Sequence, residues 1–265
     1  MKWSMCTTGW KENTLEEAAA AAGRLGLDGI EIWTGHLDGG NGRDGTLALA
    51  QARELLRRLG MSVPVISTYA RFSAGGEAES LAETEAAMRQ AVALGCPAVR
   101  VFAGGKPFAQ STAEERERMA AALEQAAKRG ERYGVTVAVE LHNNTLADSV
   151  EGVETLLTAA NHPRLRLIFD GFNLYVDGRD QLDALDRLYR WVDHVHLKNY
   201  RWQPQRWADS VPVSVFAGDV DNRKLLAELG RRGYRGFVSF EYFGEQAESC
   251  VRQSLDEVKT IAPTE

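Results

Sequence analysis

Short apolar runs rich in valine, isoleucine and aromatic residues alternate along this chain with longer amphipathic runs. The apolar runs are four to seven residues long, which is strand length, and the amphipathic runs have the period of helices. Strands separated by helices favour a parallel sheet, because a parallel pair of strands needs a crossover connection. The eight predicted strands cover residues 3–6, 29–33, 63–67, 98–102, 135–140, 165–170, 191–197 and 237–241.

The segments between the strands have helical start and stop signals. Capping boxes begin two of them at Thr14 and Thr112, and Gly95 and Gly134 follow the last residues of two helices. The eight predicted helices cover residues 14–25, 46–59, 81–94, 112–133, 150–160, 180–189, 221–232 and 246–261.

Eight strand–helix units in 265 residues predict an α/β fold, a (β/α)8 TIM barrel, as a single domain over residues 1–265. The main competitor is a doubly wound open sheet. That fold usually has fewer strands and a glycine-rich phosphate loop after the first strand. Here the first turn, residues 7–11, reads Thr-Thr-Gly-Trp-Lys and lacks that fingerprint.

The composition is that of an ordinary soluble protein, with 44% hydrophobic and 26% charged residues. The net charge of −6 argues against nucleic acid as a partner, because phosphate binding needs a basic face. Three widely spaced cysteines without a CxxC pair fit a reducing compartment. The polar start of the chain and the absence of a long apolar run predict a cytoplasmic protein with no membrane partner.

Four consecutive predicted strands each end on a residue that can ligate a metal. These residues are Glu140, Asp170, His196 and Glu241. Any one of them alone is best explained as a polar strand end that meets solvent. In a parallel barrel, however, the C-terminal ends of neighbouring strands lie side by side, so the four can converge. Three carboxylates and one imidazole suit one divalent metal ion, Mn, Mg, Co or Zn.

The chain resembles a known superfamily in its Glu…Asp…His…Glu order, in His-Val-His-Leu-Lys at residues 194–198 and in Gly-Tyr-Arg-Gly-Phe-Val-Ser-Phe-Glu at residues 233–241. It is similar to the xylose isomerase-like TIM barrels, and within them to the sugar (phosphate) isomerase/epimerase branch. The resemblance implies that the four residues hold one divalent ion. It also implies that Glu140 and Glu241 are catalytic and move a substrate proton on opposite faces.

The activity that this resemblance implies is a metal-dependent isomerase or epimerase of a ketose, keto-polyol or sugar phosphate. A metal-bound carbonyl acidifies the neighbouring C–H and stabilises an enediolate, and a nearby carboxylate can act as the base. The resemblance further implies a small-molecule carbohydrate as partner and a homodimer or homotetramer. One departure is Asn173, where many relatives have histidine. Asparagine can hydrogen-bond a substrate hydroxyl, but it cannot carry a proton as histidine does.

Three alternatives remain beside this reading. A dehydratase of the inosose or dehydroshikimate type uses the same proton abstraction and then loses a β-hydroxyl, with His142 or Lys198 as the acid. A non-catalytic sugar-binding barrel is a second alternative. An apurinic-site endonuclease shares the barrel, but five histidines and a negative net charge argue against it.

Further side chains near the predicted strand ends are expected to bind substrate through hydrogen bonds, charge or aromatic faces. They are His142, Asn173, Lys198, Arg71, Trp10, Trp33 and Arg206.

Three other features give expectations that a structure can check. Arg100 lies inside a predicted strand and is expected to point into the barrel mouth or to pair with an acid such as Glu31. His194 is expected to face the helix layer. Trp202 and Trp207, in a polar loop, are expected to form a lid or a subunit contact.

Overall fold

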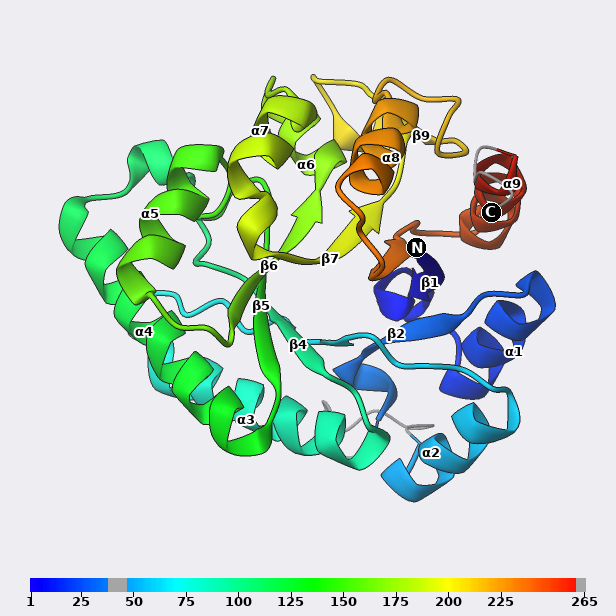
Figure 1. Cartoon of the computed structure of the whole chain (residues 1–265), viewed down its shortest axis with the longest axis horizontal. Coiled ribbons are helices and arrows are strands. Elements are labelled where there is room, and N and C mark those ends of the chain that lie inside the picture. The colour runs from blue at the N-terminus through cyan, green and yellow to red at the C-terminus, as the bar shows by residue number, and fades with distance from the viewer. Residues whose placement is uncertain (38–46, 261–265) are drawn as a thin grey trace.

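The computed structural model describes residues 1–37 and 47–260, and their strands close into a parallel barrel (Figure 1). The strand order around the barrel is β1-β10-β7-β6-β5-β4-β3-β2. The predicted eight-stranded barrel is therefore confirmed. Its strands are β1 (Lys2–Cys6), β2 (Gly29–Trp33), β3 (Ile66–Ser67), β4 (Ala98–Val101), β5 (Thr136–Glu140), β6 (Leu165–Asp170), β7 (Val192–Leu197) and β10 (Phe237–Phe240).

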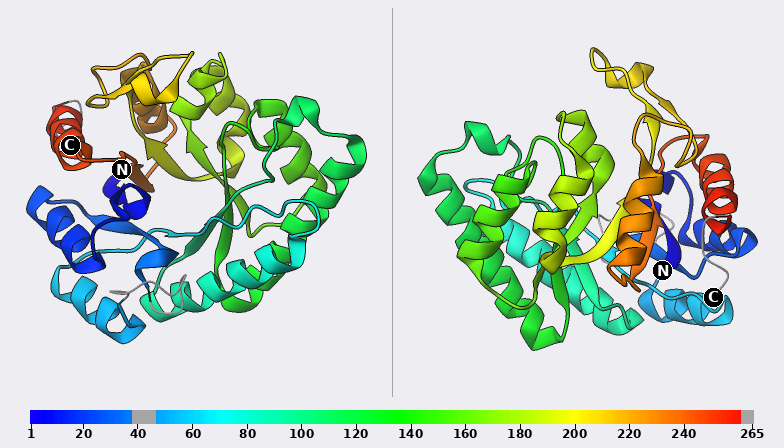
Figure 2. Two further views of the ribbon diagram at one scale, coloured as in Figure 1. Left: turned by 180° about the vertical axis from the view of Figure 1, so that it is seen from behind. Right: turned by 45° about the horizontal axis from the view of Figure 1, so that its top comes forward.

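Helices surround the barrel on its outer side (Figures 1 and 2). They are α1 (Leu15–Leu25), α2 (Leu49–Arg58), α3 (Glu77–Leu94), α4 (Ala113–Tyr133), α5 (Val150–Ala160), α6 (Gly171–Val176), α7 (Gln181–Leu188), α8 (Asn222–Arg231) and α9 (Ala247–Lys259). Short 3-10 turns are η1 (Thr7–Trp10), η2 (Thr34–His36), η3 (Phe108–Gln110), η4 (Tyr189–Trp191) and η5 (Trp207–Asp209). Both predicted capping boxes, at Thr14 and Thr112, are formed. None of the helices described is long and apolar enough to cross a membrane.

The described residues differ from the predicted elements at several places. α3 begins at Glu77 instead of residue 81, and α6 directly after β6 was not predicted. β3 is shorter than the predicted residues 63–67, because Pro64 has no N–H to donate to a ladder. The predicted start of the second helix, at residue 46, lies outside the described residues. The long loop after β7 contains a small antiparallel hairpin of β8 (Tyr200–Arg201) and β9 (Val211–Pro212), and this hairpin projects from the barrel (Figure 2).

The interior of the barrel has an apolar floor and a polar layer above it. Val65, Ala98, Ala138 and Ile168 form a separate buried cluster of their own. Because alternate residues of a strand face the same side, the inward residues two positions further along β4, β5 and β6 are charged. The strands thereby deliver arginine and carboxylate side chains to the C-terminal end of the barrel.

The space around two helix glycines, Gly130 of α4 and Gly23 of α1, predicts opposite effects of an added methyl group. A Cβ atom on Gly130 would lie 2.5 Å from the carbonyl oxygen of Val135, whereas one on Gly23 of α1 would first meet Met61 at 3.8 Å. We expect Gly130→Ala to lower the free energy of unfolding by about 1–3 kcal/mol through overpacking. Gly23→Ala should raise it by roughly 0.5–1 kcal/mol through helix propensity. Urea unfolding of both variants measures this, and equal shifts would contradict the packing.

Candidate active site

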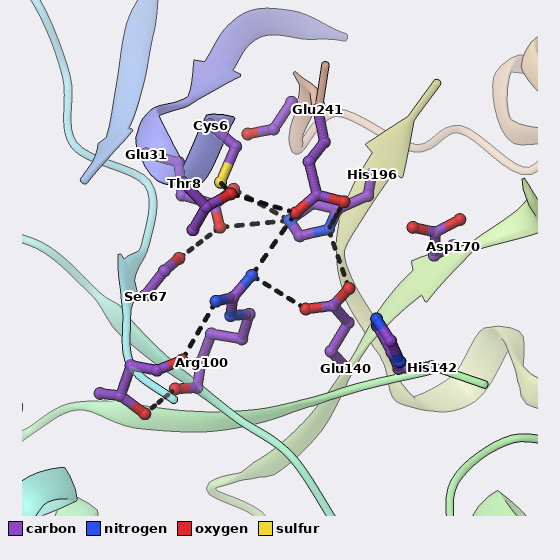
Figure 3. Close-up of polar contacts among 12 residues, drawn as sticks. Cys6, Thr8, Glu31, Ser67, Arg100, Glu140, His142, Asp170, His196 and Glu241 are labelled. Carbon is purple, nitrogen blue, oxygen red and sulfur yellow. Dashed lines mark hydrogen bonds and ion pairs between the residues drawn. The ribbon is translucent and has the colours of Figure 1, made fainter. Parts of the chain in front are cut away.

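Four side chains meet at the C-terminal end of the barrel, and all are at least 97% buried. They are Glu140 of β5, Asp170 of β6, His196 of β7 and Glu241 directly after β10 (Figure 3). One ligand atom from each lies within 4.8 Å of those of the other three. The structure thus brings together the four ligands predicted from the sequence, in a group that can hold a metal ion.

The ring of His196 is oriented to ligate a cation. Its Nε2 lies 3.0 Å from Glu31 Oε2, and a carboxylate only accepts, so the proton of a neutral ring is on Nε2. Nδ1 then has a free lone pair. Among the residues that the structure describes it has no hydrogen-bond partner, and it lies 3.5 Å from Glu140 Oε1 and 3.6 Å from Glu241 Oε2. A buried acceptor that faces two carboxylates without a donor between them fits a metal ion.

The charges around His196 also favour a cation. Burial lowers the pKa of His196, but Glu31, Glu241 and Glu140 outweigh that effect and hold the pKa well above its usual value. The negative potential that favours a second proton on this ring also favours a metal ion in place of that proton.

Glu31, in the middle of β2, was not predicted as a site residue. Its fully buried carboxylate accepts hydrogen bonds from Ser67 Oγ at 2.5 Å and from His194 Nε2 at 3.1 Å, in addition to the bond from His196. Burial raises the pKa of Glu31, but His196 and then His194 outweigh it and bring the pKa well below its usual value. The sequence feature that could have identified Glu31 is its position as the single acid in an otherwise apolar predicted strand.

The prediction that His194 faces the helix layer is wrong. His194 and His196 are two residues apart in β7 and therefore share a face. Both rings lie inside the barrel, with centroids 5.6 Å apart in an edge-to-face arrangement. His194 therefore supports Glu31 from below and does not pack against a helix.

Arg100 points into the barrel mouth, which was one of the two expectations for it. Its Nη1 lies 3.0 Å from Glu140 Oε2 and 3.5 Å from Glu241 Oε1, and Nη2 donates to the carbonyl of Thr68 at 3.0 Å. The ion pairs therefore involve two predicted ligands and not Glu31. Burial raises the pKa of Glu140, but Arg100 outweighs it, so the pKa lies below its usual value and Glu140 stays ionised.

Lys198, which was expected to bind substrate, makes ion pairs with two of the predicted ligands. Its Nζ lies 2.7 Å from Asp170 Oδ2 and 2.6 Å from Glu241 Oε2. Burial lowers the pKa of Lys198, but Asp170 and Glu241 outweigh it and hold the pKa well above its usual value. Asn173 supports the same region: its backbone N–H donates to Asp170 Oδ1 at 3.0 Å, and its side chain donates to the Leu141 carbonyl at 3.1 Å.

A cavity of about 300 Å³, the mouth cavity, opens above these residues. It includes four of the predicted substrate-binding residues, namely Arg71, His142, Asn173 and Lys198. The lining is completed by Tyr69, Arg100, Phe102, Glu140, Asn143, Val176, Trp207, Glu241 and Phe243. Its small size suits a single-ring substrate.

Three predicted substrate-binding residues do not line the mouth cavity. Trp10 is buried in the hydrophobic core. Trp33 is also buried, with its ring edge-to-face on that of His36. Arg206 pairs with Asp209 three residues later, and its side chain is 71% exposed. The structure therefore assigns the two tryptophans to packing and the arginine to the surface.

The aromatic side chains of the long seventh loop pack over the rim of the site. Trp207 lines the mouth cavity and is 50% exposed. Its ring lies 5.1 Å from those of Tyr200 and Trp202, and 6.1 Å from that of Phe172. This places Trp207 in the wall of the cavity that contains Glu140 and Glu241, two of the predicted ligands.

Comparison with known sequences decides the family. Residues 18–261 match the xylose isomerase-like TIM barrels. The chain belongs to this family. Among curated relatives, the 3-dehydroshikimate dehydratase of Bacillus anthracis is 25% identical over 276 residues, which cover 96% of this xylose isomerase-like barrel and 95% of the relative. The inosose dehydratase of Lacticaseibacillus casei is 24% identical over 142 residues, which cover 49% and 48% of the two chains.

Solved structures give the same fold. The probable 3-DHS dehydratase AsbF of Bacillus anthracis matches 98% of this xylose isomerase-like barrel, and 99% of its own chain, with a TM-score of 0.86 and 23% identity. The IOLI protein with a bound zinc atom matches 98% and 96% of the chains, with a TM-score of 0.80 and 19% identity. D-allulose 3-epimerase of Methylomonas sp. in complex with D-allulose matches 98% and 96%, with a TM-score of 0.79 and 17% identity.

The predicted isomerase or epimerase activity is wrong. The curated relatives above are dehydratases, and one of them matches this xylose isomerase-like barrel over nearly its whole length. The physical reason for the error is that metal ligands of this kind serve proton abstraction beside a ketone in both reaction classes. The ligands therefore identify the site without separating a lyase from an isomerase.

The contact between Glu31 and His196 predicts that metal affinity depends on a residue that does not touch the metal. We expect Glu31→Gln to weaken binding of Mn²⁺ by about 10- to 100-fold, because the amide holds the ring less firmly in its Nδ1-accepting tautomer. Isothermal titration calorimetry measures the dissociation constant. Glu54→Gln, on the exposed face of α2, is the control, and an unchanged affinity in Glu31→Gln would contradict the role of Glu31.

Proposed function

We propose that this protein is a metal-dependent dehydratase that removes water from a cyclic polyhydroxy ketone, with 3-dehydroshikimate as its substrate. The sequence match to a 3-dehydroshikimate dehydratase over nearly both chains supports this substrate. The observation that carries the reaction type is the position of His142, which lines the mouth cavity and makes none of the ion pairs that join the predicted ligands.

The quartet of Glu140, Asp170, His196 and Glu241 is proposed to hold one divalent ion, and its three carboxylates and one imidazole suit Mn²⁺, Mg²⁺, Co²⁺ or Zn²⁺. Such an ion supplies a Lewis acid that polarises the substrate ketone and makes the neighbouring C–H more acidic. Glu140 and Glu241 act here as ligands. The pairing with Arg100 keeps Glu140 ionised and makes it a poor proton acceptor, and with both glutamates assigned as ligands we assign the base to a different residue.

His142 has the tautomer that a general base requires. Its Nδ1 lies 2.7 Å from the carbonyl oxygen of Asn143, which only accepts, so Nδ1 carries the proton and Nε2 has the lone pair. Phe102 holds the ring edge-to-face at 5.2 Å. In the proposed reaction Nε2 takes the proton from the carbon beside the ketone, and the C–H electron pair forms the new double bond.

The same imidazole then completes the dehydration. The C–O bond to the β-hydroxyl breaks, and protonated His142 returns its proton to that oxygen, so that one water leaves and no other reactant is consumed. With 3-dehydroshikimate, loss of water and tautomerisation give the aromatic 3,4-dihydroxybenzoate. Ion pairs with Asp170 and Glu241 hold Lys198 in place, and its third N–H can donate to a substrate oxygen.

Turnover of 3-dehydroshikimate tests the function. We expect the metal-loaded protein to release 3,4-dihydroxybenzoate, identified by its ultraviolet absorption and by chromatography. Removal of the metal with a chelator should reduce the rate to background, and added Mn²⁺ or Mg²⁺ should restore it. Inosose serves as the second substrate in the panel. Absence of a dehydrated product from both ketones, with metal bound, would exclude the proposal.

Substitution of His142 tests the assignment of the base. His142→Gln keeps the size of the side chain and removes its proton transfer, so we expect kcat to fall by about 10²- to 10⁴-fold. Metal affinity should stay unchanged, because His142 is not a member of the quartet. His162→Gln, which changes a histidine beside Glu131 far from the cavity, is the matched control. A kcat within twofold of the wild type in His142→Gln would rule out this base.

A further inference from the structure

Arg71 is a cationic side chain in the wall of the mouth cavity. The proposed reaction gives it no role. It follows β3 and is half-buried. Its guanidinium carbon lies 4.9 Å from the centroid of the Phe102 ring, and that of Arg100 lies 4.8 Å from the same centroid. Both arginines therefore pack on one aromatic ring of the cavity wall, and Arg100 is committed to the two glutamates.

No carboxylate lies within ion-pair distance of Arg71 among residues 1–37 and 47–260. Its polar side-chain contact is a hydrogen bond from Nη1 to the carbonyl of Gly104, long at 3.5 Å. Arg100 makes two ion pairs and Lys198 makes two. Arg71 thus presents unused donors in the fork that matches a carboxylate.

The backbone holds Arg71 in place at the cost of strain. The next residue, Phe72, has φ 53°, a left-handed conformation that is an outlier for a bulky side chain. Hydrogen bonds fix both sides: Phe72 N–H donates to Ser80 Oγ at 3.0 Å, and Gly104 N–H donates to the Arg71 carbonyl at 2.5 Å. Strain of this kind is kept where a side chain must be presented in one position.

The charge of the cavity lining also favours an anion. Three of its side chains are cationic, Arg71, Arg100 and Lys198, and two are acidic, Glu140 and Glu241. A divalent ion on the quartet would make this lining more positive still. A neutral polyhydroxy ketone gains nothing from that potential, whereas a substrate with a carboxylate is drawn into it.

We infer that Arg71 binds the carboxylate of the substrate and that this site thereby selects an anionic cyclic ketone over a neutral one. The inference rests on the proposed dehydratase function and adds the residue that sets its specificity. One guanidinium in a cavity of about 300 Å³ fits a single carboxylate on a six-membered ring. In this assignment the quartet and His142 act on the ketone, and Arg71 fixes the opposite end of the ring.

The experiment compares 3-dehydroshikimate with its neutral methyl ester. We expect the wild type to prefer the acid, and Arg71→Gln to lower kcat/KM for the acid by about 10- to 100-fold, mainly through KM. Its rate with the ester should change by less than about threefold. The kcat/KM of Arg71→Lys for the acid should lie between those of the wild type and Arg71→Gln, because lysine keeps the charge and loses the forked donors of the guanidinium. Arg223→Gln removes an arginine stacked on Phe216 away from the cavity and is the matched control.

A second readout does not need turnover. Calorimetry with the metal-loaded protein compares 3,4-dihydroxybenzoate with catechol, which has the same two hydroxyls and no carboxylate. Tighter binding of the acid that disappears in Arg71→Gln supports the inference even if the wild type proves to have no dehydratase activity. Equal losses with acid and ester, or an undiminished preference for the acid ligand in Arg71→Gln, would overturn it.

Discussion

The hydrogen bond between Glu31 and His196 is the contact on which the candidate site depends. A carboxylate with no exposure to water is costly unless every lone pair has a donor, and Ser67, His194 and His196 provide the donors. The bond fixes which nitrogen of His196 faces the predicted metal position. It also connects β2 with β7 across the interior of the barrel, so a packing requirement and a ligand requirement are met by the same side chain.

The other buried charges at this end of the barrel are also paired. Arg100 pairs with Glu140 and Glu241, and Lys198 pairs with Asp170 and Glu241. Loss of one partner from a buried pair typically costs about 3–5 kcal/mol, because the other charge is left unpaired. The ligands are therefore held close together by cations of the chain itself. In the proposed mechanism, substrate chemistry falls to residues of the cavity wall outside these ion pairs, such as His142 and Arg71.

Sequence predicted most of the fold and the convergence of the four candidate ligands, because both depend on local patterns. Alternating runs gave the strands, and ligands at consecutive strand ends converge in any parallel barrel. Glu31 was missed because it lies in mid-strand, where only its three-dimensional partners distinguish it from a misplaced polar residue. Arg71 and Arg206 look alike in the sequence, and only the folded loops place one at the cavity and the other on the surface. The reaction class could not follow from the ligands, since they serve two classes equally.

The span of the Glu31–His196 contact has a consequence for assembly. The two residues are separated by 165 positions, and the ligands Glu140 and Glu241 lie on strands far apart in the chain. The four candidate ligands come from the neighbouring strands β5, β6, β7 and β10, whereas their support from Glu31 exists only after β2 has joined the barrel. An ion that binds this set binds the native state and not the unfolded chain, so it stabilises the protein by mass action. The metal concentration would then set part of the free energy of unfolding of the closed barrel.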